Sequence, residues 1–224
     1  ESTDTVPSEP LYWKILLDEI DFENVGFALK MPQDSLFVRT MLPKTTLKNG
    51  VIDLKEASYY VKSFGIDNAE LAYGPKEELF LQQIGLQLDS IYYCGKDIRA
   101  NIEEFVLKER SGLELVSTEG RIVSDSVLIE IPKFTMKTTA SSLDLQTKIG
   151  WDVLEMKKTG VLSAKINAEI GKGDVAKILG GRDTLFLQTY PNKPFVFRAD
   201  AEGNLNSLRL RTLEAGLAKA FELK

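Results

Sequence analysis

The chain of 224 residues is 43% hydrophobic and 27% charged, a composition typical of folded soluble proteins and not of disordered ones. Its formal net charge is −5, and because no block of lysines and arginines occurs, we expect no nucleic acid as a partner. The chain has no histidine, the commonest general base and metal ligand, and its single cysteine, Cys94, excludes an internal disulfide and a metal-binding cysteine pair. We therefore expect no catalytic residue, no cofactor and no metal, and a protein that is not an enzyme.

The first ten residues, 1–10, are polar, carry two prolines and begin with Glu1 instead of Met. They predict a flexible lead segment at the start of a fragment or processed product. No apolar run approaches the ~20 residues that a membrane-spanning helix needs. Any signal or membrane anchor is therefore expected outside this sequence.

Apolar and polar side chains alternate along most of the chain, with the period of two that indicates strands with one dry and one wet face. Segment 162–170 shows the pattern best, since Leu162, Ala164 and Ile166 alternate with polar neighbours. The same alternation predicts strands at 36–42, 52–55, 84–89, 113–115, 127–131, 134–138, 143–145, 162–170, 195–197 and 208–210. Strand starts recur roughly every 8–12 residues, which is typical of an all-β protein.

Turn residues separate these segments, and the clearest hairpin is predicted at Asn49–Gly50, because a type I′ turn needs positive φ at both central positions. Further turns are predicted at Gly74–Pro75, Gly95–Lys96, Ser124–Ser126 and Gly203–Asn204.

Three segments are less regular. Gly173–Gly181 predicts a two-turn helix that Asp174 caps at its start and Gly180 ends. The segments Asp97–Arg110 and Leu213–Leu223 fit either a helix or a strand by their periodicity. For both we predict strands, mainly because of the family resemblance given below.

An internal repeat is visible in the first third of the chain. The stretch Ile20–Leu29 returns as Phe64–Tyr73 at an offset of 44 residues, and in both copies one alternating strand leads into an asparagine and a second one leaves it. A later pair, Tyr59–Ile66 and Ile129–Met136, also matches. A fixed period in a strand-rich chain indicates stacked structural units.

These strand-and-turn units resemble the AsmA-like proteins, and within them the family of the translocation and assembly module component TamB in its Bacteroidetes-type form. The resemblance covers the chain from about Leu11 to its end. It rests on the segments Lys108–Leu115, Glu119–Gly120, Asp125–Ser126, Ile129–Pro132, Thr138–Leu143, Ala168–Val175 and Ala201–Leu205.

The resemblance implies an all-β fold: an elongated, curled, antiparallel-rich sheet shaped like a half-pipe, with at most one or two short helices. Residues 11–224 would form a single elongated β-repeat domain, a middle slice of a longer periplasmic protein whose inner-membrane anchor is absent here. Roughly 15 strands would give a trough on the order of 70 Å long. Phospholipid or another acyl-chain lipid is the implied cargo, and outer-membrane assembly proteins are the other implied partners.

Apolar residues on one face of the alternating strands are the candidates for lining such a trough. They are Leu36, Val38, Leu42, Ile52, Leu54, Leu86, Leu88, Val127, Ile129, Ile131, Phe134, Leu143, Leu145, Ile166, Phe197, Leu208 and Leu210. A packed core uses the same alternation, so a closed sandwich or barrel remains an alternative fold. The alternative functions are a scaffold that docks partners by edge-strand pairing, a carbohydrate- or protein-binding sandwich, and an enzyme.

Reactive groups are scattered. The adjacent carboxylates Asp18–Glu19, Glu77–Glu78 and Glu103–Glu104 point to opposite faces if they lie on strands, so they suit a solvated surface better than acid–base catalysis. Gly171–Asp174 resembles an anion-binding helix start but lacks the full P-loop spacing, so we interpret it as a capping turn. Cys94 suits a small strand residue.

Overall fold

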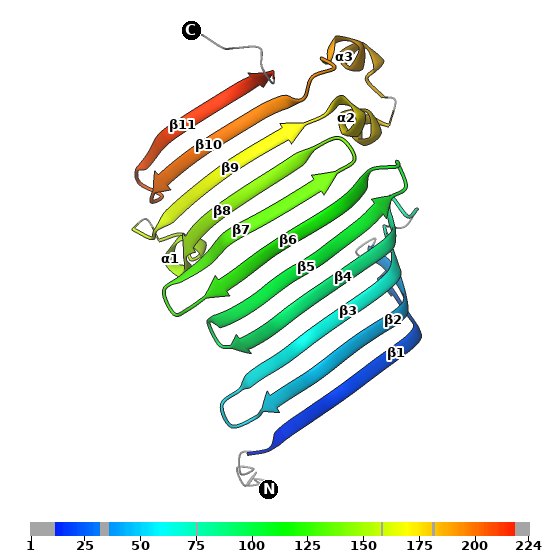
Figure 1. Ribbon diagram of the computed structural model, residues 1–224, viewed down its shortest axis with the longest axis vertical. Helices are drawn as coiled ribbons and strands as arrows, with labels where there is room; N and C mark the ends of the chain where they lie inside the picture. Colours follow the sequence, from blue (N-terminus) through cyan, green and yellow to red (C-terminus); the bar gives the residue numbers. More distant parts are fainter. Residues whose placement is uncertain (1–11, 32–35, 75, 158, 181, 218–224) are drawn as a thin grey trace, which may run out of the picture.

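A single antiparallel sheet of eleven strands makes up the protein, and the strands lie side by side in the order in which they occur along the chain (Figure 1). The computed structural model describes residues 12–31, 36–74, 76–157, 159–180 and 182–217. The strands are β1 (Lys14–Met31), β2 (Leu36–Asp53), β3 (Ser58–Tyr73), β4 (Leu79–Cys94), β5 (Asp97–Glu109), β6 (Glu114–Ser124), β7 (Leu128–Thr138), β8 (Ser142–Gly150), β9 (Leu162–Ile170), β10 (Phe195–Gly203) and β11 (Leu208–Leu217).

Three short helices interrupt the end of this series, one more than the resemblance implied. They are α1 (Trp151–Leu154), between β8 and β9, and α2 (Lys172–Leu179) and α3 (Thr184–Thr189), between β9 and β10. The all-β prediction is confirmed, as are the strands predicted for 97–110 and, as far as the chain is described, for 213–217. Eleven strands, fewer than the roughly 15 expected, make ten spacings and a sheet about 48 Å long across its strands.

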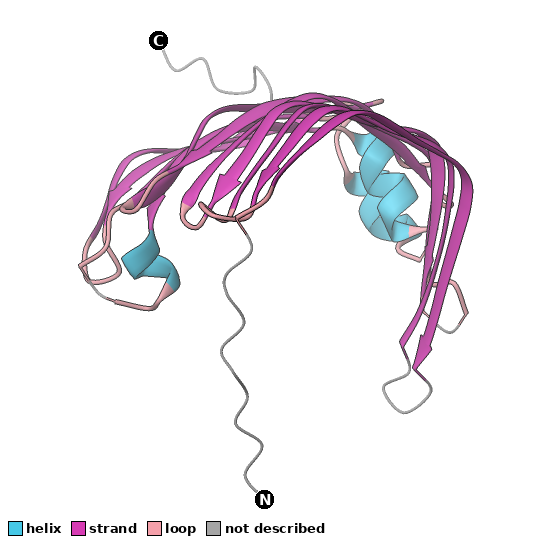
Figure 2. Ribbon diagram, turned by 90° about the horizontal axis from the view of Figure 1, so that it is seen from below, coloured by secondary structure: helices cyan, strands magenta, loops and turns pink. Residues whose placement is uncertain are grey.

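The sheet curls along its strand direction into an arch, and the short helices lie on its inner side (Figure 2). Among the described residues only three apolar ones are buried, Ala69, Ala72 and Leu115. The accessible surface is 15402 Å², against about 10,000 Å² for a compact protein of this mass. Since β1 and β11 are not neighbours and no second sheet faces this one in the described part, the closed sandwich and the closed barrel are both excluded.

Left-handed residues bend the long N-terminal strands along two lines. Asn24 on β1 (φ 53°) and Asn68 on β3 (φ 54°) lie on either side of Pro43 on β2 in the strand register. Six residues away along the strands, Asn49 on β2 (φ 52°) and Ser90 on β4 (φ 55°) mark the second line. A residue with positive φ breaks the pleat and turns the strand, so the strands run as three straight pieces around the arch.

The sequence repeat therefore has a physical meaning that differs from the predicted one. Its copies lie on β1 and β3, and each is one continuous strand with its asparagine at the bend instead of two strands joined there. The predicted hairpin at Asn49–Gly50 is wrong for the same reason. This pair lies inside β2, where Asn49 supplies a bend, and the chain reverses only after Asp53.

The other predicted turns agree with the structure. Gly95–Lys96 joins β4 to β5, Asp125 lies in the connection from β6 to β7, and Asn204 follows β10. Gly74 follows β3 with φ 91°, a conformation that glycine adopts without strain. Pro75 and the predicted lead segment 1–10 lie outside the described residues.

Candidate functional site

One row of apolar side chains crosses the whole sheet without a break in register. Each of its residues is the direct partner of the next on the neighbouring strand, so all of them point to the same face. The row, called the central row here, is Ile20, Leu47, Phe64, Leu88, Ile102, Gly120, Phe134, Leu145, Ile166, Ala199 and Leu213.

The one residue of the central row without a side chain is covered by its neighbour. A Cβ atom added to Gly120 would lie 2.8 Å from Cδ2 of Phe134, so the aromatic ring extends over the glycine. An aromatic residue opposite a glycine is a known way of keeping a sheet surface filled. The apolar surface therefore continues from β1 to β11.

A second row, the flanking row, runs parallel to the first. It consists of Ile15, Ile52, Tyr59, Tyr93, Ile98, Ser124, Ile129, Ile149, Leu162, Gly203 and Leu208. It lies on the same face as the central row, because Ile149 and Leu145 are four residues apart on the regular strand β8. The rings of Tyr59 and Tyr93 lie 5.9 Å apart between centroids, which adds an aromatic contact within the row.

The bends keep the apolar face continuous. On β1 the two rows place Ile15 and Ile20 on one face although they are five residues apart, and on β2 they do the same with Leu47 and Ile52. An unbroken pleat would put residues at an odd spacing on opposite faces. The left-handed residue Asn49 between Leu47 and Ile52 supplies the one-residue shift that restores the face.

Fifteen of the seventeen residues predicted to line a trough lie on strands with their apolar neighbours. Four are on the central row (Leu88, Phe134, Leu145, Ile166) and three on the flanking row (Ile52, Ile129, Leu208). Five belong to the adjoining positions of the same face (Leu86, Leu143, Phe197, Ile131, Leu210), and three to the strand ends beyond the Asn24 bend (Leu36, Val38, Leu42).

Two of the predicted residues are not on the sheet surface. Leu54 follows the end of β2 in the turn to β3, and its N–H donates a 3.0 Å hydrogen bond to the carbonyl oxygen of Trp13. Val127 lies in the turn between β6 and β7, 63% exposed. Alternation alone placed them on strands, but it cannot tell the last strand residue from the first turn residue.

Several residues of the rows were not among the predicted ones. Ile15, Ile20, Leu47, Ile98 and Ile102 are the clearest examples. A signal was present, because each is an apolar residue in an alternating segment or beside one. The register that lines them up with their partners on the neighbouring strand is set by the bends and bulges, and these were not recognised from the sequence.

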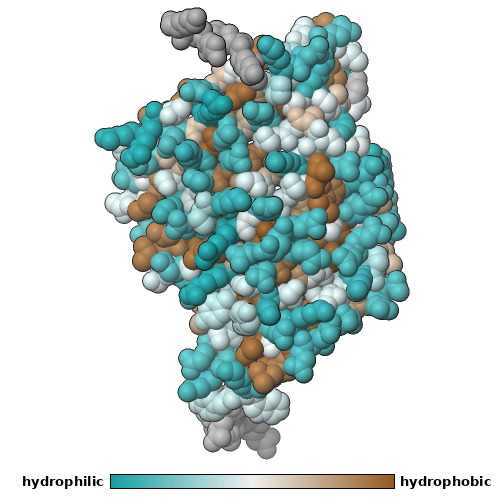
Figure 3. All heavy atoms as spheres, viewed as in Figure 1, coloured by the Kyte–Doolittle hydropathy of each residue, from teal (hydrophilic) through white to brown (hydrophobic). Residues whose placement is uncertain are grey.

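The opposite face of the sheet is polar. In the C-terminal half it carries a row of Glu119, Thr135, Asp144, Asn167, Arg198 and Glu214. Arg198 links two members of this row, with its guanidinium 3.2 Å from Asn167 Oδ1 and 3.2 Å from Glu214 Oε2. Figure 3 shows the convex side of the arch, and hydrophilic residues predominate over it. The central and flanking rows therefore line the concave side, which we call the trough.

Helices stand at the two edges of the trough in its C-terminal half. α1 follows the end of β8 and α2 follows the end of β9, so they lie at opposite ends of these antiparallel strands, both on the concave side (Figure 2). Neither covers the rows, since Leu145, Ile166 and Leu213 remain half-buried or exposed. Among the residues that the structure describes, nothing closes the trough along its length.

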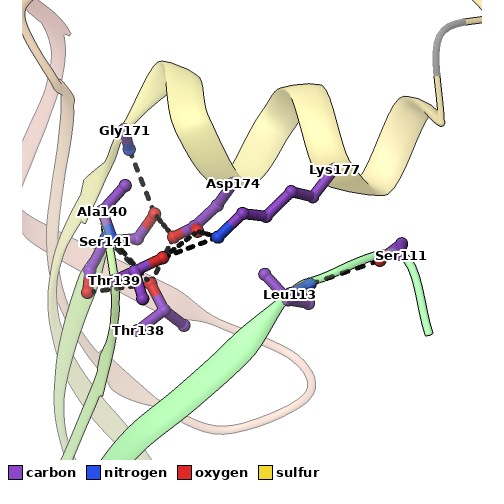
Figure 4. Close-up of polar contacts among 9 residues, drawn as sticks. All are labelled: Ser111, Leu113, Thr138, Thr139, Ala140, Ser141, Gly171, Asp174 and Lys177. Atoms are coloured by element: carbon purple, nitrogen blue, oxygen red, sulfur yellow. Dashed lines mark hydrogen bonds and ion pairs between the residues drawn. The ribbon is translucent and has the colours of Figure 1, made fainter. Parts of the chain in front are cut away.

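A buried carboxylate holds α2 in this position (Figure 4). Asp174, 3% exposed, accepts hydrogen bonds from the hydroxyls of Thr138, the last residue of β7, and of Ser141 (2.6 Å) and Thr139 (3.3 Å) in the connection to β8. Lys177 lies 3.8 Å from the same carboxylate. The predicted role of Asp174 as the helix cap is wrong, because the cap position is Gly171 and Asp174 is inside the first turn.

These contacts also set the charge state of Asp174. Burial alone would raise the pKa of this carboxyl group, but the hydrogen bonds from Ser141, Thr138 and Thr139 and the charge of Lys177 outweigh it, so the pKa lies below its usual value. The group is therefore an ionised anchor at neutral pH. Gly180 ends the helix in the left-handed conformation (φ 54°), as the sequence predicted.

The other reactive groups fit structural roles. Glu77 bridges Arg39 (2.6 Å) and Arg110 (3.0 Å), and Cys94 is half-buried on β4. Within the described ranges, no group of three or more histidine, cysteine or acidic residues is placed to hold a metal ion. In that same part of the chain, no helix is long and apolar enough to cross a membrane.

Comparison with known proteins adds no relative. No protein-family model matches the chain, and neither a curated protein nor a solved structure matches it. The resemblance to the AsmA-like proteins therefore stays a prediction from the sequence.

Proposed function

We propose that this chain is a segment of a cell-envelope protein whose trough carries the acyl chains of phospholipids. The observation that carries the proposal is the pair of apolar rows that cross all eleven strands on a concave face with no facing layer in the described part of the chain. In an ordinary domain such rows would be covered and form the core. Here they are available to a ligand that is itself long and apolar.

The energetics favour such a ligand. Moving an acyl chain of about 16 carbons through water costs on the order of 12 kcal/mol, at ~0.8 kcal/mol per methylene. An apolar strip about 48 Å long removes most of this cost at every point along the path. The open side leaves the lipid head group in solvent, so its charge is never desolvated.

The polar convex face suits the same role. The ion pair between Lys48 and Glu19 (2.7 Å) and the cluster around Arg198 keep that side in water. Under the proposal the protein lies in the periplasm, belongs to the AsmA-like and TamB proteins, acts in lipid transport or outer-membrane biogenesis, and has no catalytic activity.

Site-specific photo-crosslinking tests the proposal with a control built into each strand. We expect Leu145→p-benzoylphenylalanine, on the central row, to capture labelled phospholipid. The neighbouring variant Asp144→p-benzoylphenylalanine points to the convex face and should capture several-fold less. Phe64 and Ser63 form the same kind of pair on β3, so both ends of the trough can be compared.

Equal labelling within each pair would contradict the proposal, as would the absence of lipid from all four variants. Capture at Leu145 alone would restrict the ligand to the C-terminal half. Phospholipid that copurifies with the protein and is detected by mass spectrometry provides a second measurement that needs no substitution.

A second candidate function is a scaffold that docks partners by edge-strand pairing. The observation in its favour is that β1 and β11 each have only one neighbour among the described strands, and nearly every residue of both is exposed. A long uncovered edge presents unpaired backbone groups to another chain. A crosslinker at Leu213 on β11 would then capture protein while one at Ile166 captures neither protein nor lipid. Lipid at Ile166 favours the trough instead.

A further inference from the structure

The connection between β9 and β10 is unusually long for this sheet. Residues 171–194 separate the two strands and carry α2 and α3, whereas β4 and β5 are joined by the two residues Gly95–Lys96. Long connections in compact sheets are uncommon and usually functional. This connection, called the helical rim here, lies at one edge of the open side of the trough (Figure 2).

Large apolar side chains of the helical rim point into solvent. Leu185 is 73% exposed, Ile178 62% and Phe186 47%. They are close in the chain, at the end of α2 and the start of α3. These apolar side chains therefore have no partner over much of their surface in the described structure.

The helical rim has a positive net charge in an otherwise acidic protein. The rim contains four basic residues and two acidic ones, while the whole chain has a net charge of −5. Both acids are engaged, since Asp174 is bound to the β7–β8 connection and Asp183 accepts a 2.9 Å hydrogen bond from the N–H of Phe186. Lys172, Arg182 and Lys193 form no ion pair within the described residues.

The opposite edge of the trough provides an internal comparison. The connection that carries α1 also exposes apolar residues, with Leu154 at 54% and Met156 at 77%. Its charges cancel locally, because Lys157 lies 3.0 Å from Asp152 and 2.7 Å from Glu155. Among the described residues, exposed apolar side chains occur at both edges, but cations without an ion-pair partner accompany them at the helical rim alone.

From this combination we propose that the helical rim docks the protein onto an anionic phospholipid bilayer, with the open side of the trough toward the membrane. Leu185, Phe186 and Ile178 enter the interfacial region, and Arg182, Lys172 and Lys193 contact phosphate groups. An exposed apolar tip flanked by cations is the chemistry by which peripheral helices bind anionic membranes. The inference extends the proposed function to the place where lipid enters, but membrane binding does not depend on the trough being occupied.

Vesicle flotation tests this inference on the whole chain. We expect binding to vesicles of phosphatidylcholine with about 30% phosphatidylglycerol, and much weaker binding to phosphatidylcholine alone. The double variant Leu185→Ser/Phe186→Ser should lose roughly tenfold or more of the binding, because two exposed apolar anchors are removed. Arg182→Gln should lose about fivefold on the anionic vesicles only.

The matched control is Leu154→Ser/Met156→Ser, which removes two equally exposed apolar side chains from the α1 edge and should bind like the wild type. Circular dichroism checks that all variants keep the sheet. The inference is overturned if the wild type does not float, if both double variants lose binding equally, or if binding ignores the anionic lipid. It is also overturned if Phe186 makes two copies of this chain associate with each other instead of binding the vesicles. Photo-crosslinks at Leu145 report on the trough independently, so either proposal can fail without the other.

Discussion

The two ends of the sheet build the sides of the same trough in different ways. β1 to β4 have 16 to 18 residues each and bend at two lines of left-handed residues, so the strands themselves turn down to form the side of the arch. β8 to β10 have nine residues each and contain no left-handed residue before the terminal Gly203. β8 and β9 lead into the helices α1 and α2, which stand on the concave side. Figure 2 shows both solutions in one view.

The contrast teaches that the apolar surface and the curvature are specified separately. The central row passes through both regions with direct register, so neither construction interrupts it. In the N-terminal region, curvature depends on a few backbone conformations. In the C-terminal region a helix stands at the edge of the trough, and side-chain contacts hold it there, chiefly those of Asp174. Substitutions that affect one construction should leave the other intact.

The largest expected effect comes from the bends. Valine at position 24 or 68 would have to adopt φ near 54°, a conformation that β-branched residues strongly avoid. Asn24→Val and Asn68→Val should each lower the free energy of unfolding by about 1–2 kcal/mol. Urea denaturation of the two single variants measures this, and the double variant measures how strongly the two residues of this bend line are coupled through β2.

Two controls separate backbone strain from other causes. Glycine adopts positive φ without strain, so Asn68→Gly should change stability little. Asn167→Val on β9 replaces an asparagine in ordinary extended backbone and loses only the exposed 3.2 Å bond from Arg198. If Asn68→Val costs no more than Asn167→Val, the left-handed conformation at the bend does not impose the strain argued above.

The same contrast explains what the sequence could predict. Alternation suffices for strands, so β9 and the all-β class were predicted from residues such as Leu162 and Ile166. The repeated asparagines Asn24 and Asn68 were noticed, but sequence pattern does not distinguish an asparagine that bends a strand from one that ends it, and Asn49–Gly50 was interpreted as a hairpin for this reason. The same residue types, asparagine and glycine, favour positive φ in a hairpin turn and in a bend within a strand.

The long-range parts of the site were beyond sequence reasoning. Asp174 precedes an apolar helical segment and looks like a cap, yet its partners Thr138 and Ser141 are more than 30 residues away. The rows depend on the registers of all ten strand pairs taken together. Bulges such as the one between Ile131 and Phe134 on β7 shift these registers. A single sequence contains no direct signal for either.

A smaller and local effect is expected at the Asp174 anchor. Asp174→Ala leaves the hydroxyl of Ser141 without its acceptor and leaves Thr138 only the carbonyl oxygen of Ser141, so it should destabilise the docking of α2 by about 1–3 kcal/mol. Hydrogen exchange of segment 171–180 should accelerate while β1 to β4 keep their protection. Asp183→Ala is the matched control, because it removes only the cap of α3. Faster exchange in β3 after Asp174→Ala would show that the two regions are coupled.

The finest test of the comparison is the pH dependence of that anchor. The pKa of Asp174 is lowered in the folded protein, so its contribution is complete above the unfolded value of about 3.9 and is lost as the pH falls through the folded pKa. The difference in exchange of segment 171–180 between the wild type and Asp174→Ala should thus be constant from pH 7 to about 5 and shrink below about 4. Other carboxylates also have lowered pKa values, such as Glu109, whose carboxylate Ser111 hydrogen-bonds, but they are present in both proteins and cancel in the difference. A difference that persists at pH ~2 would mean that hydroxyl contacts independent of charge hold α2 at the trough. A difference that already shrinks near neutrality would contradict the lowered pKa of Asp174.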